Sequence, residues 1–487
     1  MKYLHIFDEE INFESTKERL ERPWVSLVEE TEKVFCMKAY KPNPSVWYKI
    51  EGNTLYIRGT EQEGYSERVL YTDTTLAKNG WYNASNKAQI TKAVIEEVIS
   101  PTSCVRFFDG MKGMTTIENI ENIKMDNATS MRTMFQLCKA LTSVGDLSNW
   151  NVANITDMAY MFNQCSALTS VGDLDKWNVA NVTSMRGMFS QCNALTSVGN
   201  LDNWNVANVT DMRTMFQLCK ALTSVGNLSN WNVANVTDMA YMFNQCNALT
   251  SVGDLDKWNV SNVTSMQSMF NICNTLTSVG DLSNWNVSNV TSMQSMFGDC
   301  FALTSVGKLD NWNVSNETNM RAMFNSDGPS PLILSSIGNI SKWDVSNVTD
   351  MSFMFRGCTS LDELNLSSWN TSKVTNMYEA FSNYNSENKY TDFSIPKINV
   401  PPISKNCNIA YAFAYDYSLT TIESSGKISK SVNFQWSPLT HDSAMVLINA
   451  LDSENTGTLT LSAATKETLT EADIAIATGK GWTIASA

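Results

Sequence analysis

The stretch MAYMFNQCSALTSVGDLDKWNVANVTS, Met158–Ser184, decides the fold because it recurs along the chain with a period of 27 residues. A tryptophan marks the same position in every copy. The tryptophans are Trp150, Trp177, Trp204, Trp231, Trp258, Trp285 and Trp312, followed after one insertion and one deletion by Trp343 and Trp369. A fixed period of this length predicts a solenoid, since each unit buries its apolar face only against its neighbours.

Each unit has two parts with different apolar spacing. The first predicts a short helix, because its apolar residues are spaced i, i+3, i+4 and i+7, at Met158, Met161, Phe162 and Cys165. The second, LTSVGDL at Leu168–Leu174, is predicted to be a strand with inward-facing Leu168, Val171 and Leu174. Parallel strands stack about 4.8 Å apart and helices are roughly 10 Å thick. We therefore expect the stack to curve with its strands on the concave side.

The unit resembles the BspA-type leucine-rich repeats of bacterial surface proteins. The segment LTSVGDLSNWNVSNVTSMQSMF, Leu276–Phe297, carries the closest likeness, and the resemblance extends over roughly residues 90–430. It implies an α/β fold: a curved leucine-rich-repeat solenoid whose 27-residue units each hold a short strand plus a short helix. It also implies a role like that of the family, whose members are mostly noncatalytic adhesins and surface proteins.

The chain divides into three predicted parts: a β-rich N-terminal attachment domain at 1–85, the solenoid at 86–430 and a C-terminal cap at 431–487. In the first part, Val46–Ile50 and Leu55–Arg58 read as a hairpin, and Trp24–Val28 and Val34–Met37 as short strands. Three tryptophans, Trp24, Trp47 and Trp81, are expected in its core. A strand at Ile90–Ile99 and the pair Phe107 and Phe108 are expected to begin the solenoid.

The cap is predicted to run strand, helix, strand, helix, strand, with Thr440 and Thr470 capping the helices. Its KGWT-like end resembles the closing segment of repeat proteins from gut phages and bacteria. A second period of 81 residues also appears, since MRTMFQLCKALTSVG occurs at Met131–Gly145 and again at Met212–Gly226. Three units have therefore been copied as a block.

Several residue columns allow two interpretations. The cysteines Cys138, Cys165, Cys192, Cys219, Cys246, Cys273 and Cys300 form either a ladder of buried thiols or disulfides, and the expected spacing of stacked helices favours thiols. The paired methionines form either core or a promiscuous binding surface. The tryptophans form either core or an exposed edge for sugar stacking.

A polar column beside the predicted strand is either solvated or binds calcium. Its members are Asp146, Asp173, Asn200, Asn227, Asp254, Asp281 and Lys308. One unit is irregular: Asn325–Trp343 is four residues longer than usual, has Asp327 where cysteine belongs, and follows Glu317 at a Val or Ile position. This unit is either a bend or protruding loop, or a tolerated defect.

Composition excludes several classes of function. The net charge of −14 and pI near 4.8 disfavour nucleic-acid binding. The two histidines, His5 and His441, lie in different predicted domains, so we expect no metal site, no cofactor and no enzyme. No apolar run is long enough for a membrane span, and we expect no signal peptide.

The sequence therefore predicts a noncatalytic phage virion structural protein, in a fibre, spike or similar appendage assembled in the host cytoplasm. The N-terminal domain would bind other virion proteins, and the chain would be a homo-oligomer. The solenoid would recognise a host cell-surface protein or glycan through positions that vary between units: Arg132, Tyr160, Arg186, Arg213, Tyr241, Gln267 and Gln294. Drift explains the same variation. The alternatives are a bacterial BspA-like interaction protein outside any virion, and a glycan-degrading enzyme.

Overall fold

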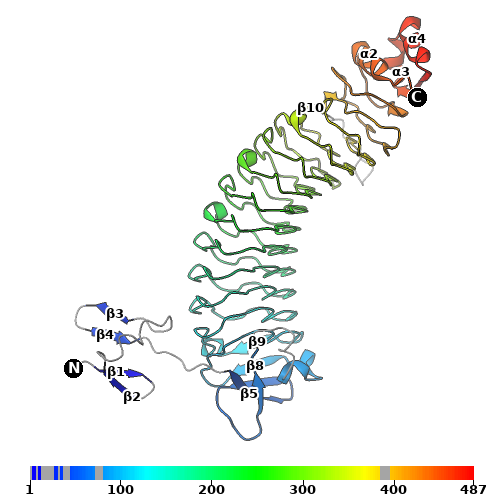
Figure 1. Ribbon diagram of the computed structural model, residues 1–487. Helices are drawn as coiled ribbons and strands as arrows, with labels where there is room; N and C mark the ends of the chain where they lie inside the picture. The colour runs from blue at the N-terminus through cyan, green and yellow to red at the C-terminus, as the bar shows by residue number, and fades with distance from the viewer. Residues whose placement is uncertain are drawn as a thin grey trace.

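A computed structural model describes residues 44–71, 80–328, 330–383 and 395–487, and the backbone of four short strands before them. These four are β1 (Tyr3–Ile6) with β2 (Glu9–Asn12), and β3 (Leu27–Glu30) with β4 (Lys33–Cys36), each pair antiparallel. The second pair agrees with the strands expected around residue 31, whereas Trp24 lies outside the described residues. From residue 90 onward the chain winds into a long curved stack that ends in a helical cap (Figure 1).

Successive rungs of the stack are joined by main-chain hydrogen bonds. In one rung the N–H groups of Met158, Tyr160 and Phe162 donate to carbonyls of the next rung, at 3.0, 2.7 and 2.8 Å. Single parallel bridges, such as Asp157 with Ser184, repeat at the same position along the stack. The N–H groups between them close turns inside the rung, since Met161 donates to the carbonyl of Met158 at 3.2 Å.

The helix predicted for Met158–Cys165 is therefore wrong. The segment is a series of tight turns, with Tyr160 and Gln164 in the left-handed region at φ of 59° and 63°. An α-helix keeps its hydrogen bonds to itself and is about 10 Å wide, whereas the phenylalanine rings of neighbouring rungs, Phe135 to Phe297, stack only 5.2 to 5.9 Å apart. Rungs this close leave no room for helices.

The strand predicted for Leu168–Leu174 is present only as a single bridge residue. Only Ser170 forms a bridge there, to Ser143 and Ser197. In some rungs a 3-10 turn begins at the last residue of the equivalent segment: η4 (Leu228–Asn230), η5 (Leu282–Asn284) and η6 (Ile340–Lys342). The architecture is a strand-rich repeat with few helices.

The direction of curvature is opposite to the prediction. Tryptophan rings stack 6.3 to 6.5 Å apart, more widely than the phenylalanine rings. The stack therefore bends toward the turn segment that carries Phe162 and its equivalents. Figure 1 shows the 3-10 turns, which each precede a tryptophan, on the outer side of the bend.

The interior of the stack consists of uninterrupted columns of identical residues. Phe162 and Met161 are fully buried, and Trp177 is 3% exposed, which excludes an exposed tryptophan edge and a methionine surface. The indole N–H of Trp177 donates to the carbonyl of Leu147 at 2.9 Å. The thiol of Cys165 donates to the carbonyl of Phe135 at 3.0 Å. All seven repeat cysteines are free, as predicted, and burial raises the pKa of the Cys192 thiol to about 12.

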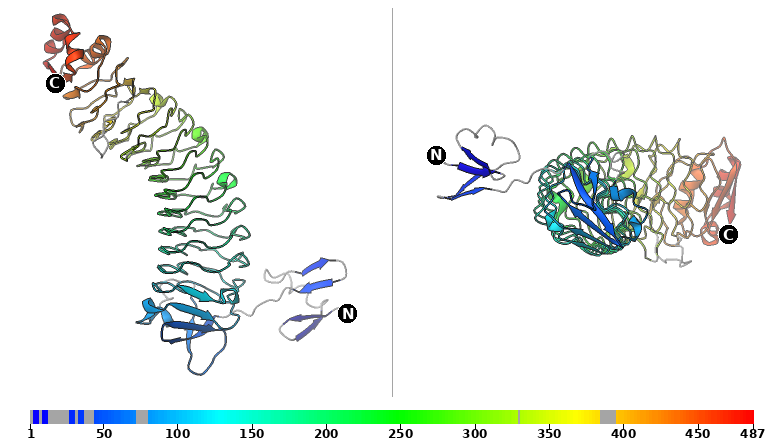
Figure 2. Two further views of the ribbon diagram at one scale, coloured as in Figure 1. Left: turned by 180° about the vertical axis from the view of Figure 1, so that it is seen from behind. Right: turned by 90° about the horizontal axis from the view of Figure 1, so that it is seen from below.

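A five-stranded sheet covers the first rungs, in the order β7 (Ser66–Val69), β5 (Ser45–Glu51), β6 (Thr54–Arg58), β8 (Lys92–Ile95) and β9 (Thr116–Glu118). The predicted hairpin forms its antiparallel half, and β8 joins β6 in parallel. Figure 2 shows these strands lying across the end of the stack. The sheet continues through the predicted boundary at residue 85. Three 3-10 turns lie beside it: η1 (Gly80–Asn83), η2 (Lys87–Gln89) and η3 (Ile120–Asn122).

Of the tryptophans expected in this region, Trp81 is buried and Trp47 is half-buried. The alternation of strand β5 explains the difference, because Val46 occupies the inward position beside Trp47. The predicted first rung is confirmed, since the rings of Phe108 and Phe135 stack at 5.3 Å.

The irregular unit keeps its place in the stack. Trp343 stacks on Trp312 at 6.3 Å and Phe324 on Phe355 at 5.7 Å, so both columns continue through it. The additional residues leave Ile333 exposed. A tolerated insertion describes this rung better than a bend.

The C-terminal end contains a parallel pair, β10 (Leu364–Asn365) and β11 (Ile398–Asn399), and then a parallel sheet of β12 (Val432–Phe434), β13 (Gly457–Leu461) and β14 (Trp482–Ser486). Its helices are α2 (His441–Ala450), α3 (Ala463–Glu467) and α4 (Glu471–Gly479). Thr440 and Thr470 cap α2 and α4, as predicted. The short α3 was not predicted.

Candidate recognition face

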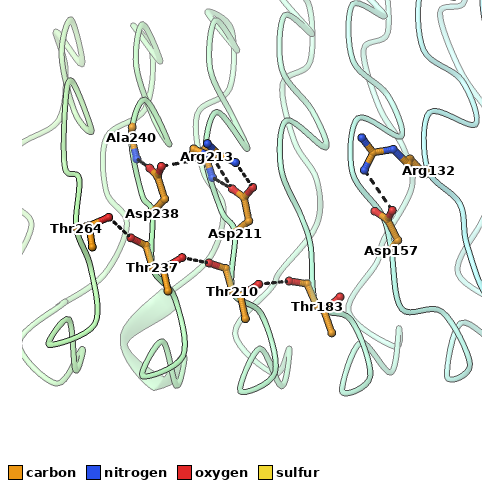
Figure 3. A network of polar contacts seen from close by, with 10 residues as sticks. All are labelled: Arg132, Asp157, Thr183, Thr210, Asp211, Arg213, Thr237, Asp238, Ala240 and Thr264. Carbon is orange, nitrogen blue, oxygen red and sulfur yellow. Dashed lines mark hydrogen bonds and ion pairs between the residues drawn. The ribbon is translucent and has the colours of Figure 1, made fainter. Parts of the chain in front are cut away.

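Three parallel columns of polar side chains lie on one face of the stack (Figure 3). The first is a column of exposed threonines. The hydroxyl of Thr210 donates to the carbonyl of Thr183 at 3.2 Å, and that of Thr237 to the carbonyl of Thr210 at 3.1 Å. The adjacent main-chain N–H groups donate to the same carbonyls. These hydrogen bonds join each rung to the one before it, so few hydroxyl and carbonyl groups of this column remain for a ligand.

The second column occupies the bridge position before the first methionine of each rung. Where it holds aspartate, the carboxylate accepts the N–H two residues on, as Asp157 does from Ala159 at 2.8 Å and Asp238 from Ala240 at 2.9 Å. Burial is the main cause that raises the pKa of Asp238. In Asp157 and Asp238, Oδ1 accepts this hydrogen bond of the turn and Oδ2 contacts an arginine.

The third column contains the arginines. Arg213 contacts Asp211 at 2.6 Å and, through Nε, Asp238 at 3.5 Å. Arg132 contacts Asp157 at 3.3 Å. The hydrogen bond to Asp211 is the main cause that raises the pKa of Arg213. The Arg213–Asp238 and Arg132–Asp157 pairs join neighbouring rungs, whereas the Arg213–Asp211 pair lies within one rung. Together they hold the guanidinium groups at the surface.

Tyr160 lies between two of these arginines. The guanidinium carbons of Arg132 and Arg186 are 5.7 and 5.5 Å from the centre of its ring, within cation–π distance. A Cβ on Gly187 would lie 2.6 Å from the ring, so the glycine makes room for the tyrosine. Arg132, Tyr160 and Arg186 therefore form one fixed group.

All seven predicted recognition residues are half-buried and occupy the two positions after the first methionine of a rung. We call this set the recognition face: Arg132, Tyr160, Arg186, Arg213, Tyr241, Gln267 and Gln294. Gln294 accepts a hydrogen bond from Asn319 at 3.1 Å. Among the described residues, no ion-pair or ring contact links Tyr241 or Gln267 to the others. The role of the set in recognition remains a prediction.

The same positions carry further aromatic and basic residues that the sequence analysis missed. Toward the C-terminus, Arg321 lies 4.8 Å from the ring of Phe353, Phe353 meets Tyr378 at 5.3 Å, and Tyr378 meets Tyr411 at 6.0 Å. The signal is present in the sequence, since each of these residues lies one or two positions after the first apolar residue of its rung. Arg321 keeps the 27-residue register, whereas the insertion after Phe324 shifts Phe353, Tyr378 and Tyr411 out of it.

The polar column considered for calcium contains carboxylates used within their own turns. Asp146 accepts the N–H of Ser148 at 2.9 Å, and Asp281 that of Ser283 at 2.9 Å. In the part of the chain that the structure describes, no group of three or more His, Cys, Asp or Glu residues is placed to hold a metal. His441 contacts Asp473 at 3.2 Å on the cap, and the His5 side chain lies outside the described residues.

Within the described residues, no helix has the length and apolarity that crossing a membrane requires. No curated protein matches the sequence. Two solved structures show a low likeness. One is the Drosophila Toll–Spatzle complex, at 11% identity and a TM-score of 0.18, covering 90% of this chain and 72% of that one. The other is the TLR13–ssRNA13 complex, at 12% and 0.15, covering 92% and 68%. Scores this low carry no argument about fold or function.

A protein-family model described as "Mycoplasma protein of unknown function, DUF285" matches residues 102–226, 194–304, 220–330 and 304–418. These matches together span well over half of the chain. They agree with the coarser part of the resemblance seen in the sequence, a protein built from leucine-rich-type repeats. The chain belongs to the DUF285 family of mycoplasma proteins of unknown function.

Proposed function

We propose that this chain is a noncatalytic interaction protein that binds a protein on a cell surface through the recognition face. One observation carries the proposal: the buried columns are nearly invariant from rung to rung, whereas the half-buried positions beside them change between Arg, Tyr and Gln. Packing explains an invariant interior and places no demand on these outer positions.

The chemistry of the face suits a protein partner. Arginine and tyrosine are the residues most often found at the centre of protein interfaces. The ion pairs and ring contacts around Arg132, Tyr160 and Arg186 hold these side chains in place before binding, which lowers the entropy lost on association.

The test uses residues that other rungs already contain. Tyr160→Thr copies Thr133 and Thr214, and Arg186→Gln copies Gln267, so the double variant should fold normally. Labelled full-length protein is applied to a panel of bacterial and animal cells. We expect saturable binding to at least one cell type, and a loss of at least tenfold in the double variant.

The control is Lys176→Ala, an exposed residue beside Trp177, away from the recognition face. Equal binding by the wild type and the double variant would contradict the proposal. Binding that survives protease treatment of the cells and disappears on deglycosylation would identify a glycan instead.

The narrower hypothesis from the sequence, a virion appendage that is a homo-oligomer anchored through residues 1–85, remains a second proposal. It is supported by the repeat of adhesive type and by a distinct segment ahead of the solenoid. The family description names mycoplasma proteins and no phage. Mass spectrometry of purified virions decides it, since the hypothesis requires this chain among the particle proteins, and its absence would leave the bacterial interaction protein.

A further inference from the structure

The series of main-chain hydrogen bonds that joins each turn segment to the next rung ends near the C-terminal cap. Met377, Glu379 and Phe381 donate their N–H groups to the carbonyls of Asn408, Ala410 and Ala412, at 2.7, 3.1 and 2.9 Å. The bridge between Asn376 and Asn408 is the last of its column among the described residues. The rung that begins at Asn408 is therefore the final one in this series.

Three N–H groups of this final rung lack a partner among the residues that the structure describes. Its turns are closed normally, since Ala412 donates to the carbonyl of Ile409 at 3.1 Å. The N–H groups of Ile409, Tyr411 and Phe413 correspond to those of Met377, Glu379 and Phe381. No hydrogen bond joins these three donors to any residue that the structure describes.

The cap covers the rest of the final rung and stops short of this edge. Parallel bridges continue the stack elsewhere, from Ile403 to Ile428 and on to Leu451. The ring of Phe434 stacks on that of Phe413 at 4.4 Å. Between the two parts lies a cavity of about 410 Å³, whose lining includes Asn408, Ile409, Tyr411, Lys430, Asn433 and Trp436. Tyr411 is 55% exposed.

The opposite end of the same series is covered. There the first rung would present carbonyl groups, and the buried side chain of Arg68 donates to the carbonyls of Phe107 and Val105 at 3.2 and 3.3 Å. The indole of Trp81 also donates to the carbonyl of Phe107. A second copy of the chain cannot stack head to tail on the open end, because its own acceptors are already occupied.

We propose that the open edge at Ile409–Phe413 binds a peptide segment of a partner protein, which folds into the turns of a rung and adds to the stack in parallel. The donors lie on alternate residues, and each rung of this stack accepts from such donors through carbonyls on alternate residues, as Asn408, Ala410 and Ala412 do. Addition of a segment to an open hydrogen-bonding edge is a known mode of peptide recognition. The bound segment needs a small residue opposite Phe413, because Phe434 already covers that ring. Lys430 is the charged member of the lining, and its Nζ donates to the carbonyl of Cys407 at 2.8 Å. This contact holds the cation beside the edge, where it favours an acidic side chain in the peptide.

This site lies beyond the recognition face and does not depend on the function proposed above. The first measurement is residue-resolved amide hydrogen exchange on the full chain. We expect the amides of Ile409 and Tyr411 to exchange at least tenfold faster than those of Met377 and Glu379. Equal protection in the free protein would overturn the proposal, since the edge would then already be paired.

The second measurement adds a synthetic peptide that copies Lys405–Ala412, the segment whose carbonyls pair with the rung below. At millimolar concentration it should slow exchange at Ile409 and Tyr411. Tyr411→Asn should weaken peptide binding at least tenfold. Thr214→Asn is the control, because Thr214 has the same turn position in an inner rung, at φ of 56° against 57° for Tyr411, and lies outside the recognition face. A peptide that protects neither amide, or protection by an oligosaccharide instead, would overturn the proposal.

Discussion

At the scale of single residues, the repeat is held by side chains that hydrogen-bond to the neighbouring backbone. The Trp177 indole and the Cys165 thiol each donate to a carbonyl of the preceding rung. Asparagine does the same at the surface, where Asn181 donates to the carbonyl of Ala153 at 2.8 Å. Each rung therefore satisfies buried carbonyls of the rung before it, and a substitution in one rung affects two.

Glu317 departs from this pattern, because it occupies the buried position that Val290 holds one rung earlier. Its carboxylate accepts the N–H groups of Thr318 and Asn319, at 3.1 and 2.8 Å. Burial nonetheless raises its pKa from 4.5 to about 7. A raised carboxyl pKa means that the folded state holds the proton more tightly, so stability from this group is present below pH 4.5 and is lost as pH rises through 7.

We therefore predict that Glu317→Val stabilises the protein at pH 8 and does so much less at pH 5. The shift corresponds to about 3 kcal/mol between the two conditions. Chemical denaturation of both chains at the two pH values measures it, and the other carboxyls cancel because both chains contain them. A stability difference that stays constant with pH would show that Glu317 does not titrate in this range.

At the scale of the rung, the turn segment forms the tightest packing. Phe243 is fully buried, with its ring between those of Phe216 and Phe270 at 5.5 and 5.6 Å, whereas Tyr241 is half-buried on the recognition face. Side chains from alternate turns thus divide between core and surface, which is why a helical spacing of apolar residues arises without a helix.

Phe243→Ala should cost ~3–5 kcal/mol by leaving a cavity in the phenylalanine column. Tyr241→Ala, two residues earlier, should cost less than half as much. Denaturant melts of the two variants make the comparison. Similar losses in both would mean that the rung is packed differently from this description.

The sequence predicted the inward face of each rung correctly, and its secondary structure incorrectly. Burial of Met158, Phe162 and Cys165 followed from their spacing, because turns of three residues return side chains to one side much as a helix does. The spacing did not reveal which carbonyls accept from the main-chain N–H groups, because half of those carbonyls belong to the neighbouring rung. The open edge at Tyr411 was also not predictable, since it arises from where the cap stops.

At the scale of the whole molecule, the stack needs covers at both ends. The sheet of β5–β9 seals the first rung, with Arg68 and Trp81 buried against it. The predicted boundary at residue 85 runs through this sheet, so the solenoid and the segment from Pro44 onward share one core.

A chain that starts at Pro44 should therefore melt at the same temperature as the full protein. A chain that starts at Ile90 loses β5 and β6, exposes Phe107 and leaves carbonyls of the first rung without donors. It should melt at a lower temperature or be insoluble. Identical melting of both truncated chains would contradict the role given to the N-terminal sheet.

The central claim is that an invariant stack presents a binding surface made by a few variable residues. Deleting residues 158–238 removes three complete units, including Tyr160, Arg186 and Arg213, and joins Asp157 to Met239 in register. Deleting residues 239–319 also removes three units, including Tyr241, Gln267 and Gln294, and joins Asp238 to Met320.

Cell binding by these two chains, equal in length, tests the claim most directly. Both should fold with one cooperative transition, because each keeps the period and both ends of the stack. We predict that the first deletion abolishes binding to the cell type recognised by the full chain and that the second retains it. Equal loss, or equal retention, would contradict the claim that Tyr160, Arg186 and Arg213 form the part of the recognition face that makes the binding surface.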